Sequence, residues 1–324
     1  MKQIFTGILA LFFIAFFPAC EGKKSAAPKM GGLKVVAVNF PAYDFAHAIT
    51  GGKADILMLL PPGAESHSFE PTPKDIITIQ NSDVFIYTGG ESDAWVDRIL
   101  ESIDTSKKKI VRMMDAVDTV EEEIVEGMQD TPSDESEDEQ TEEVEYDEHI
   151  WTSPRNAQRI AQAITDALCA AAEEKSNAAD AALFRQNSLA YIQKLAELDA
   201  EFQAIVDGAA RKTIVFGDRF PFRYFADAYG LKYFAAFPGC STETEPSAAT
   251  VAFLINKIKA EKIPVVFHIE LSNEKMADAI AAETGAKKLL LHSCHNISKK
   301  DFDSGLTFLE IQKANTAALK ESVQ

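Results

Sequence analysis

The chain has 324 residues, of which 32 are basic and 50 are acidic, and its formal net charge at pH 7 is −18. Residues 115–148 hold 17 of the acidic residues and no Lys or Arg, so that 33 acidic and 32 basic residues remain elsewhere. This balance, without a basic and aromatic-rich patch, argues against nucleic-acid binding. A chain of this length favours two domains over one.

The N-terminus has the pattern of an export signal. A charged start precedes an apolar run over 4–17, which is shorter than the roughly 20 residues that span a bilayer. Cys20 follows a small residue as in a bacterial lipobox, so we predict a signal peptide over 1–19, lipidation of Cys20 and a flexible tether over 20–32. A simple cleaved signal and a retained anchor are the alternatives. The prediction places the protein in the cell envelope, lipid-anchored on the periplasmic or extracellular face of a bacterial membrane.

Strand and helix patterns alternate over 33–152, which predicts an N-terminal α/β lobe. Short, β-rich apolar runs separated by short helices are typical of a parallel sheet with crossover helices. We expect strands over 33–40, 56–60, 84–87 and 109–113, and helices over 42–49, 73–81 and 93–103.

The acidic run over 115–148 interrupts this lobe. It has few apolar residues and contains Pro, Gly and several Ser and Thr, so we predict a disordered loop. The run ends in Asp147-Glu148-His149. Two interpretations follow: a solvated linker without a function, or a weak collector of cations beside a metal ligand. The attachment of the run to His149 favours the second interpretation.

Residues 153–210 lack strand signals and predict linker helices. Ser153 and Pro154 suit the cap and the first position of a helix. A second helix is expected over 178–206, where apolar residues recur at spacings of three, four and seven. At 1.5 Å per residue this helix spans about 40 Å, which is long enough for a rigid strut along two lobes.

Residues 211–324 repeat the α/β pattern and predict a C-terminal lobe. The predicted fold class is therefore α/β, with two parallel-sheet lobes joined by a long rigid helix and a ligand site in the cleft between them. We expect strands over 213–216, 232–236, 265–269 and 288–291, and helices over 222–229, 246–260, 273–283 and 306–319.

Six histidines are the candidate metal ligands, because neutral imidazole binds zinc at pH 7. In parallel sheets, ligands bind beyond the carboxyl ends of the strands. His67 and His292 follow predicted strands and His149 lies on the loop that leaves the first lobe, so all three can line one cleft. His295, three residues after His292, is the candidate for a fourth ligand. The alternatives for that position are Glu243 and Glu270.

Two cysteines each follow the end of a predicted strand. An exported protein lies where disulfides persist, so we predict a disulfide between Cys240 and Cys294. Free thiols and thiolate zinc ligands are the alternatives, although no CxxC spacing supports ligation.

The strings PPGAESHSFEPTP, around His67, and DEHIWTSP, around His149, resemble the metal-ligand motifs of the metal-specific solute-binding proteins of bacterial ABC importers. ETEPS, VVFHIELSNEKMADAIAAETGAK and a final helix with Asn315 continue the likeness, which covers nearly the whole chain from Leu33 onward. Within this family the chain is similar to the zinc-uptake (ZnuA-like) branch, in which an acidic or His-rich loop precedes the second ligand.

The resemblance implies two α/β lobes joined by a rigid helix, with one metal ion held between them. His67 and His149 match the family's first two ligands. The family's third ligand falls on Gly217, which has no side chain that binds metal, and its fourth falls on His292. The resemblance also implies a monomer whose partners are a membrane permease and its ATPase.

The expected function is capture of Zn²⁺ outside the cytoplasm and its delivery to the permease. Three imidazoles suit zinc, whereas manganese-binding relatives complete their site with two carboxylates. The alternatives are a manganese-binding homologue, a lipid-anchored surface adhesin and a zinc-dependent hydrolase. The sequence contains neither HExxH nor GxSxG, so we predict that the protein is not an enzyme.

Overall fold

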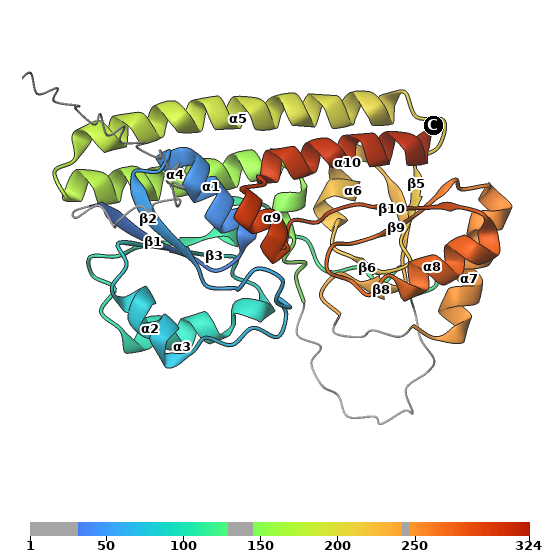
Figure 1. Cartoon of the computed structure of the whole chain (residues 1–324), viewed down its shortest axis with the longest axis horizontal. Coiled ribbons are helices and arrows are strands. Elements are labelled where there is room, and N and C mark those ends of the chain that lie inside the picture. The colour runs from blue at the N-terminus through green and yellow to red at the C-terminus, as the bar shows by residue number, and fades with distance from the viewer. Residues whose placement is uncertain (1–31, 129–144, 242–245) are drawn as a thin grey trace, which may run out of the picture. The chain divides into compact units, whose positions relative to one another are not determined.

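Parallel β-sheets with helices packed against them make up the described part of the chain in the computed structural model (Figure 1). The structure describes residues 32–128, 145–241 and 246–324. The predicted signal peptide, Cys20 and Glu243 lie outside the described residues. Within the described ranges, no helix is both long enough and apolar enough to cross a bilayer.

The N-terminal sheet has four parallel strands, as predicted. They are β1 (Leu33–Ala37), β2 (Ala54–Met58), β3 (Val84–Tyr87) and β4 (Lys109–Arg112). Their order in the sheet is β2-β1-β3-β4. Successive residues of β1 alternate between the two faces, so that Val35 packs into one core and Val36 into another.

Side chains at the loop ends start the helices of this lobe. Asn39 accepts a hydrogen bond from the backbone N–H of Ala42 and caps the first helix. Thr72 and Asp75 form a reciprocal capping box at the second. The helices are α1 (Phe40–Thr50), α2 (Pro73–Gln80) and α3 (Trp95–Ser102), and the 3-10 turns are η1 (Glu91–Asp93), η2 (Met113–Ala116) and η3 (Ile150–Thr152).

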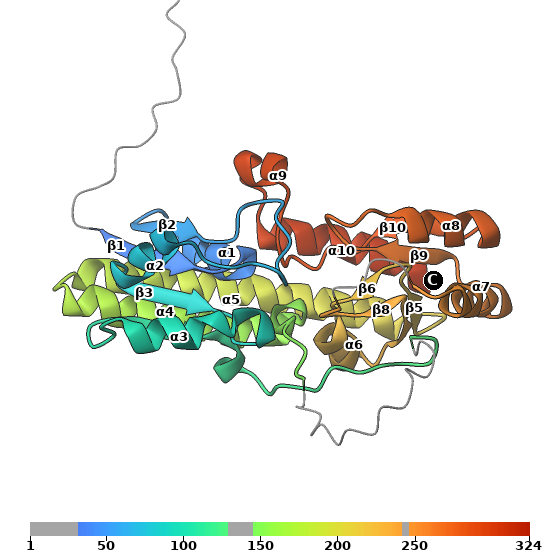
Figure 2. The ribbon, with the colours of Figure 1, turned by 90° about the horizontal axis from the view of Figure 1, so that it is seen from below.

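Two long antiparallel helices follow, α4 (Pro154–Glu174) and α5 (Ala178–Asp207). Pro154 begins α4 as predicted, although the Ser153 side chain makes no capping hydrogen bond. The 30 residues of α5 span about 45 Å. Leu195 packs into the N-terminal core and Phe202 into the C-terminal core, so this helix runs along both sheets, as Figures 1 and 2 show.

The C-terminal lobe contains a second parallel sheet. Its strands are β5 (Thr213–Val215), β7 (Lys232–Phe234), β9 (Val265–His268) and β10 (Lys287–Leu290), while β6 (Arg219–Phe220) and β8 (Phe237–Pro238) form a separate parallel pair. β5 pairs with β7 and β9 with β10, and a parallel bridge between Phe216 and Phe267 joins the two pairs. The short pair of β6 and β8, which the sequence did not predict, positions Arg219.

The last helix contacts both lobes. The helices of this half are α6 (Arg223–Tyr229), α7 (Ala248–Glu261), α8 (Lys275–Thr284), α9 (Lys299–Ser304) and α10 (Phe308–Val323). Phe308 and Ile311 pack into the N-terminal core, whereas Leu319 and Val323 pack into the C-terminal core. Because α10 lies along α5, its first half packs with the N-terminal core and its second half with the C-terminal core.

The flanks of the acidic run are ordered, which corrects the prediction of a disordered loop over all of 115–148. A bridge between Glu121 and Tyr146 pairs the two flanks, and the backbone N–H of Asp147 donates to the carbonyl of Val120. Met128 is buried in the C-terminal core. Burial of Met128 anchors the first flank, and backbone hydrogen bonds tie the second flank to it. The interior of the run, 129–144, lies outside the described residues.

Candidate metal centre

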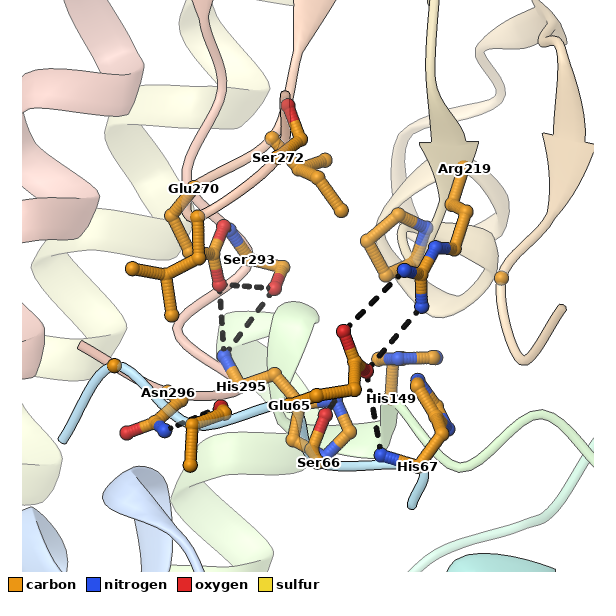
Figure 3. A pocket seen from close by; sticks show the side chains of 16 residues that line it. Glu65, Ser66, His67, His149, Arg219, Glu270, Ser272, Ser293, His295 and Asn296 are labelled. Carbon is orange, nitrogen blue, oxygen red and sulfur yellow. Dashed lines mark hydrogen bonds and ion pairs between the residues drawn. The ribbon is translucent and has the colours of Figure 1, made fainter. Parts of the chain in front are cut away.

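Three histidines from separate parts of the chain meet in one cavity (Figure 3). His67 lies on the loop between β2 and α2, His149 directly before η3, and His295 on the loop between β10 and α9. Ring nitrogens of the three lie within 4.8 Å of one another. The ring centroids are 5.5 Å apart for His67 and His149, 4.9 Å for His67 and His295, and 5.0 Å for His149 and His295.

The two loops that carry His67 and His295 are held to each other. The Asn296 side-chain amide donates to the carbonyls of Pro61 and Ala64, at 2.9 and 2.8 Å. Pro61 begins the turn that the sequence places between β2 and His67. These contacts join the ends of strands from different lobes, so they position both histidines at one cleft.

Each of the three rings uses Nδ1 for a hydrogen bond within the protein. This arrangement leaves Nε2 of each ring as the nitrogen that can bind a metal, and it fixes the ring orientation. The pairs are His67 with Ser92 Oγ at 3.0 Å, His149 with Asp147 Oδ1 at 3.0 Å, and His295 with Ser66 Oγ at 3.2 Å.

Asp147 is the partner that sequence reasoning missed. Its Oδ1 accepts from both the backbone N–H and Nδ1 of His149, at 2.7 and 3.0 Å, and its side chain is buried. Tyr224 donates to the Asp147 carbonyl at 2.8 Å and fixes this segment. Its position two residues before His149 was the sequence feature that could have identified Asp147 as the partner of this histidine. Asp147 and Glu148 are both buried acids of the run, and Asp147 is the one that bonds the ring of His149.

The electrostatic environment differs among the three imidazoles. Burial, followed by repulsion from His149, lowers the pKa of His67 to about 3. Burial also lowers the pKa of His295 well below its ordinary value, and the charge of Arg219 adds to both shifts. Burial opposes the charged form of His149 as well, but the Asp147 carboxylate outweighs it and raises the pKa of His149. The rings of His67 and His295 are therefore neutral at pH 7, the form in which a ring nitrogen can bind a metal.

His292 does not join the cluster, contrary to the prediction. Its Nδ1 accepts from the backbone N–H of Cys294 at 3.0 Å and lies 3.4 Å from Glu270 Oε2. The backbone turns at Cys294, whose φ is 66°, so the chain changes direction between His292 and His295. The histidine that follows this turn, His295, is the one that reaches the cavity.

Glu270 lines the cavity but is engaged by the loop. It accepts hydrogen bonds from the backbone and hydroxyl of Ser293, at 2.7 and 2.6 Å, and from the backbone N–H of His295 at 3.1 Å. Because its oxygens hold the loop that carries His295, Glu270 positions this histidine and is not part of the cluster.

Gly217, where the family resemblance placed a ligand, is packed too closely for any side chain. A Cβ on Gly217 would lie 2.6 Å from Cα of Ala277 in α8. Two residues further on, the Arg219 side chain enters the cavity and pairs with Glu65. The cavity has a volume of about 170 Å³, which is more than one ion fills.

The predicted disulfide is not formed, and Cys240 and Cys294 are both free thiols. Cys294 is fully buried in the N-terminal core, where the Gln312 side chain donates to its sulfur at 3.5 Å. Cys240 lies beside the acidic flank, and its backbone N–H donates to Glu122 at 2.8 Å. Strand order alone does not bring the two loops together. Burial raises the pKa of both thiols, so neither is a thiolate at neutral pH.

A family model described as the zinc-uptake complex component A, periplasmic, matches residues 35–322. The chain belongs to this family. Members of this family are metal-binding components of transport systems. The match confirms the family resemblance inferred from the two histidine motifs.

Individual members extend the comparison. The zinc-binding lipoprotein AdcA of Streptococcus pneumoniae is 30% identical over 322 residues, which cover 99% of this chain and 61% of AdcA. The chain thus spans about three-fifths of that relative. The high-affinity zinc uptake system protein ZnuA of Bacillus subtilis is 32% identical over 301 residues, with 93% of this chain and 91% of ZnuA covered.

Solved structures confirm the predicted fold class. The Zn(II)-bound ZnuA-like domain of S. pneumoniae AdcA has a TM-score of 0.71 and 28% identity, covering 90% of this chain and 99% of that domain. The metal-dependent lipoprotein YcdH of B. subtilis has a TM-score of 0.74 and 31% identity, covering 90% and 100%.

Proposed function

We propose that this chain is the extracytoplasmic zinc-binding component of an ABC importer, which captures Zn²⁺ and delivers it to a membrane permease. The observation that carries the proposal is the convergence of His67, His149 and His295, each with Nε2 left for a metal. Relatives named for zinc binding and zinc uptake support it. A permease with its ATPase, a lipid anchor at Cys20 and a monomeric state belong to the same proposal.

The donor set favours zinc over manganese. Imidazole nitrogens suit Zn²⁺, whereas carboxylate-rich sites suit the harder Mn²⁺. The three histidines supply three of the four positions of a tetrahedral site. The cavity beside them leaves the fourth position to water or to a further protein oxygen.

We infer that the site binds and releases metal without catalysing a reaction. A zinc hydrolase needs a general base and a pocket for its substrate beside the metal-bound water. Asp147 and Glu270, which bond His149 and the backbone of His295, are already occupied by hydrogen bonds from the protein. One zinc per chain without turnover of esters or peptides is the expected result of metal analysis and activity assays.

Zinc titration of single alanine variants tests the ligand set. His67→Ala, His149→Ala and His295→Ala should each weaken zinc binding by at least about 100-fold, because losing a ligand costs more than losing its hydrogen-bond partner. Competition against a chelator of known affinity measures the change.

The chain offers two controls for this titration. His47 is exposed on α1 and stacks on Tyr43, so His47→Ala should leave zinc affinity unchanged. His292→Ala distinguishes the observed cluster from the predicted one, and we expect a smaller effect than for His295→Ala. Equal zinc affinity in wild type and all three cluster variants would contradict the proposed site.

A further inference from the structure

The cavity that holds the three histidines also contains a permanent positive charge. Among the described residues that line it, Arg219 is the single Lys or Arg. It begins the short strand β6 of the C-terminal lobe, and its side chain is 18% exposed. A guanidinium stays charged at every physiological pH and repels a cation placed beside it. This residue type is unexpected in a site for a divalent cation.

The partner of Arg219 is a carboxylate from the loop that carries His67. The two guanidinium nitrogens donate to Glu65 Oε1 and Oε2, at 3.4 and 3.3 Å. Oε1 also accepts from the backbone N–H of His67 at 3.4 Å. Both carboxylate oxygens are therefore engaged, and Figure 3 shows the carboxylate between Arg219 and His67, facing the cavity.

Glu65 is the protein oxygen best placed to change its role. It stands two residues before His67, lines the same cavity, and its side chain is 51% exposed, so little packing restrains it. The histidines supply three donors, and a carboxylate oxygen is a common fourth ligand of zinc. In the structure Glu65 lies outside the cluster of histidine nitrogens, and its carboxylate pairs with Arg219 instead.

We propose that Arg219 is a positioning residue that withholds Glu65 from the metal and thereby lowers zinc affinity and speeds release. The proposal rests on the three-histidine site above. Arg219 acts in two ways: it occupies the lone pairs of Glu65, and it places a positive charge near the bound ion. Weaker binding suits a carrier that must surrender its cargo. The ion pair is partly exposed and hence weak, so we expect an effect of about tenfold.

A double-mutant cycle tests this role. Arg219→Gln should tighten zinc binding about tenfold and slow zinc release to a chelator, because the freed carboxylate becomes the fourth ligand. Glu65→Gln should weaken binding, because the guanidinium is then left without its counter-charge. Arg219→Gln/Glu65→Gln should return to within about threefold of wild type, which makes the two effects strongly non-additive. Arg185→Gln on α5, which removes an equal charge far from the cavity, should change nothing.

Cobalt substitution supplies a readout that a structural role for Arg219 would not move. In the Co²⁺ protein, replacing water by a carboxylate shifts the visible absorption, so the Arg219→Gln spectrum should differ from those of wild type and the double variant. Unchanged or weaker zinc binding by folded Arg219→Gln overturns the proposal. Equal tightening in Arg219→Gln and the double variant also overturns it, because Glu65 then plays no part. Failure of the wild-type chain to bind zinc refutes the metal site itself.

Discussion

His149 and Asp147 form the best-defined pair in the cavity. The carboxylate fixes the ring of His149 through Nδ1 and raises its affinity for a proton at Nε2, the nitrogen proposed above to bind the metal. The other two rings have lowered pKa values, so protons compete with metal mainly at His149. Proton competition at the site is therefore concentrated on a single residue.

Zinc affinity should depend on pH through this residue. The pKa of His149 lies above its ordinary value of 6.5, so the proton is bound more tightly and affinity should already fall above pH 6.5. The fall should approach tenfold per pH unit below that pKa, because one proton is displaced per zinc. Titrations over pH 5–8 measure the slope.

Asp147→Asn should separate the two effects of the carboxylate. Zinc binding at pH 8 should weaken by about 10- to 100-fold, because the ring loses its charged partner. The onset of the pH dependence should move to lower pH, because the proton loses the same partner. Asp166→Asn, on the polar face of α4, is the control. An onset that stays in place would show that Asp147 does not set the pKa of His149.

The helix α5 connects the two lobes mechanically. Its buried residues belong to the N-terminal core in its first half and to the C-terminal core in its second half. With α10 lying beside it, the two helices restrain bending between the lobes.

Two leucines on α5 provide a matched test of this packing. Leu195 is fully buried in the N-terminal core, whereas Leu189 is 71% exposed on the same helix. Leu195→Ala should lower the free energy of unfolding by about 2–5 kcal/mol, the usual cost of a core cavity. Leu189→Ala should change it by less than about 0.5 kcal/mol. Urea denaturation measures both, and similar losses would show that the buried face of α5 is assigned wrongly.

At the scale of the whole molecule, the histidine cluster is built from segments that are distant in sequence. His67 and His295 come from opposite ends of the chain, and they meet because Asn296 bonds the carbonyls of Pro61 and Ala64. Bound metal would add a further connection between the same segments. Metal binding should therefore stabilise the chain against unfolding as a unit.

Thermal unfolding with and without zinc measures this linkage. Free zinc at 100 times the Kd should stabilise the folded chain by about 2.7 kcal/mol, because only the folded state assembles the site. His149→Ala should lose most of the shift, and a chelator should reverse it in wild type. Stabilisation of His149→Ala equal to that of wild type would place the bound zinc elsewhere.

Local patterns were sufficient for much of the fold. The apolar periodicity over 178–206 predicts α5 almost to the residue, and the β-rich runs predict the parallel strands of both sheets. His67 and His149 were identified from their motifs and lie in the cluster. The helix, the strands and the two motifs depend on residues that are close together along the chain, so a single sequence is enough to predict them.

Contacts between segments that are distant along the chain could not be predicted from local sequence patterns. The sequence placed His292 ahead of His295 as a ligand, whereas the structure brings His295, which follows the turn at Cys294, into the cluster. Cys240 and Cys294 both follow strands, yet burial of Cys294 under α10 keeps them apart. The chain by itself determined most of its elements, its family and two members of the histidine cluster, because those follow from local periodicity and motif. The tertiary structure decided the third histidine and the Arg219–Glu65 pair, because both depend on how loops from two lobes pack against each other.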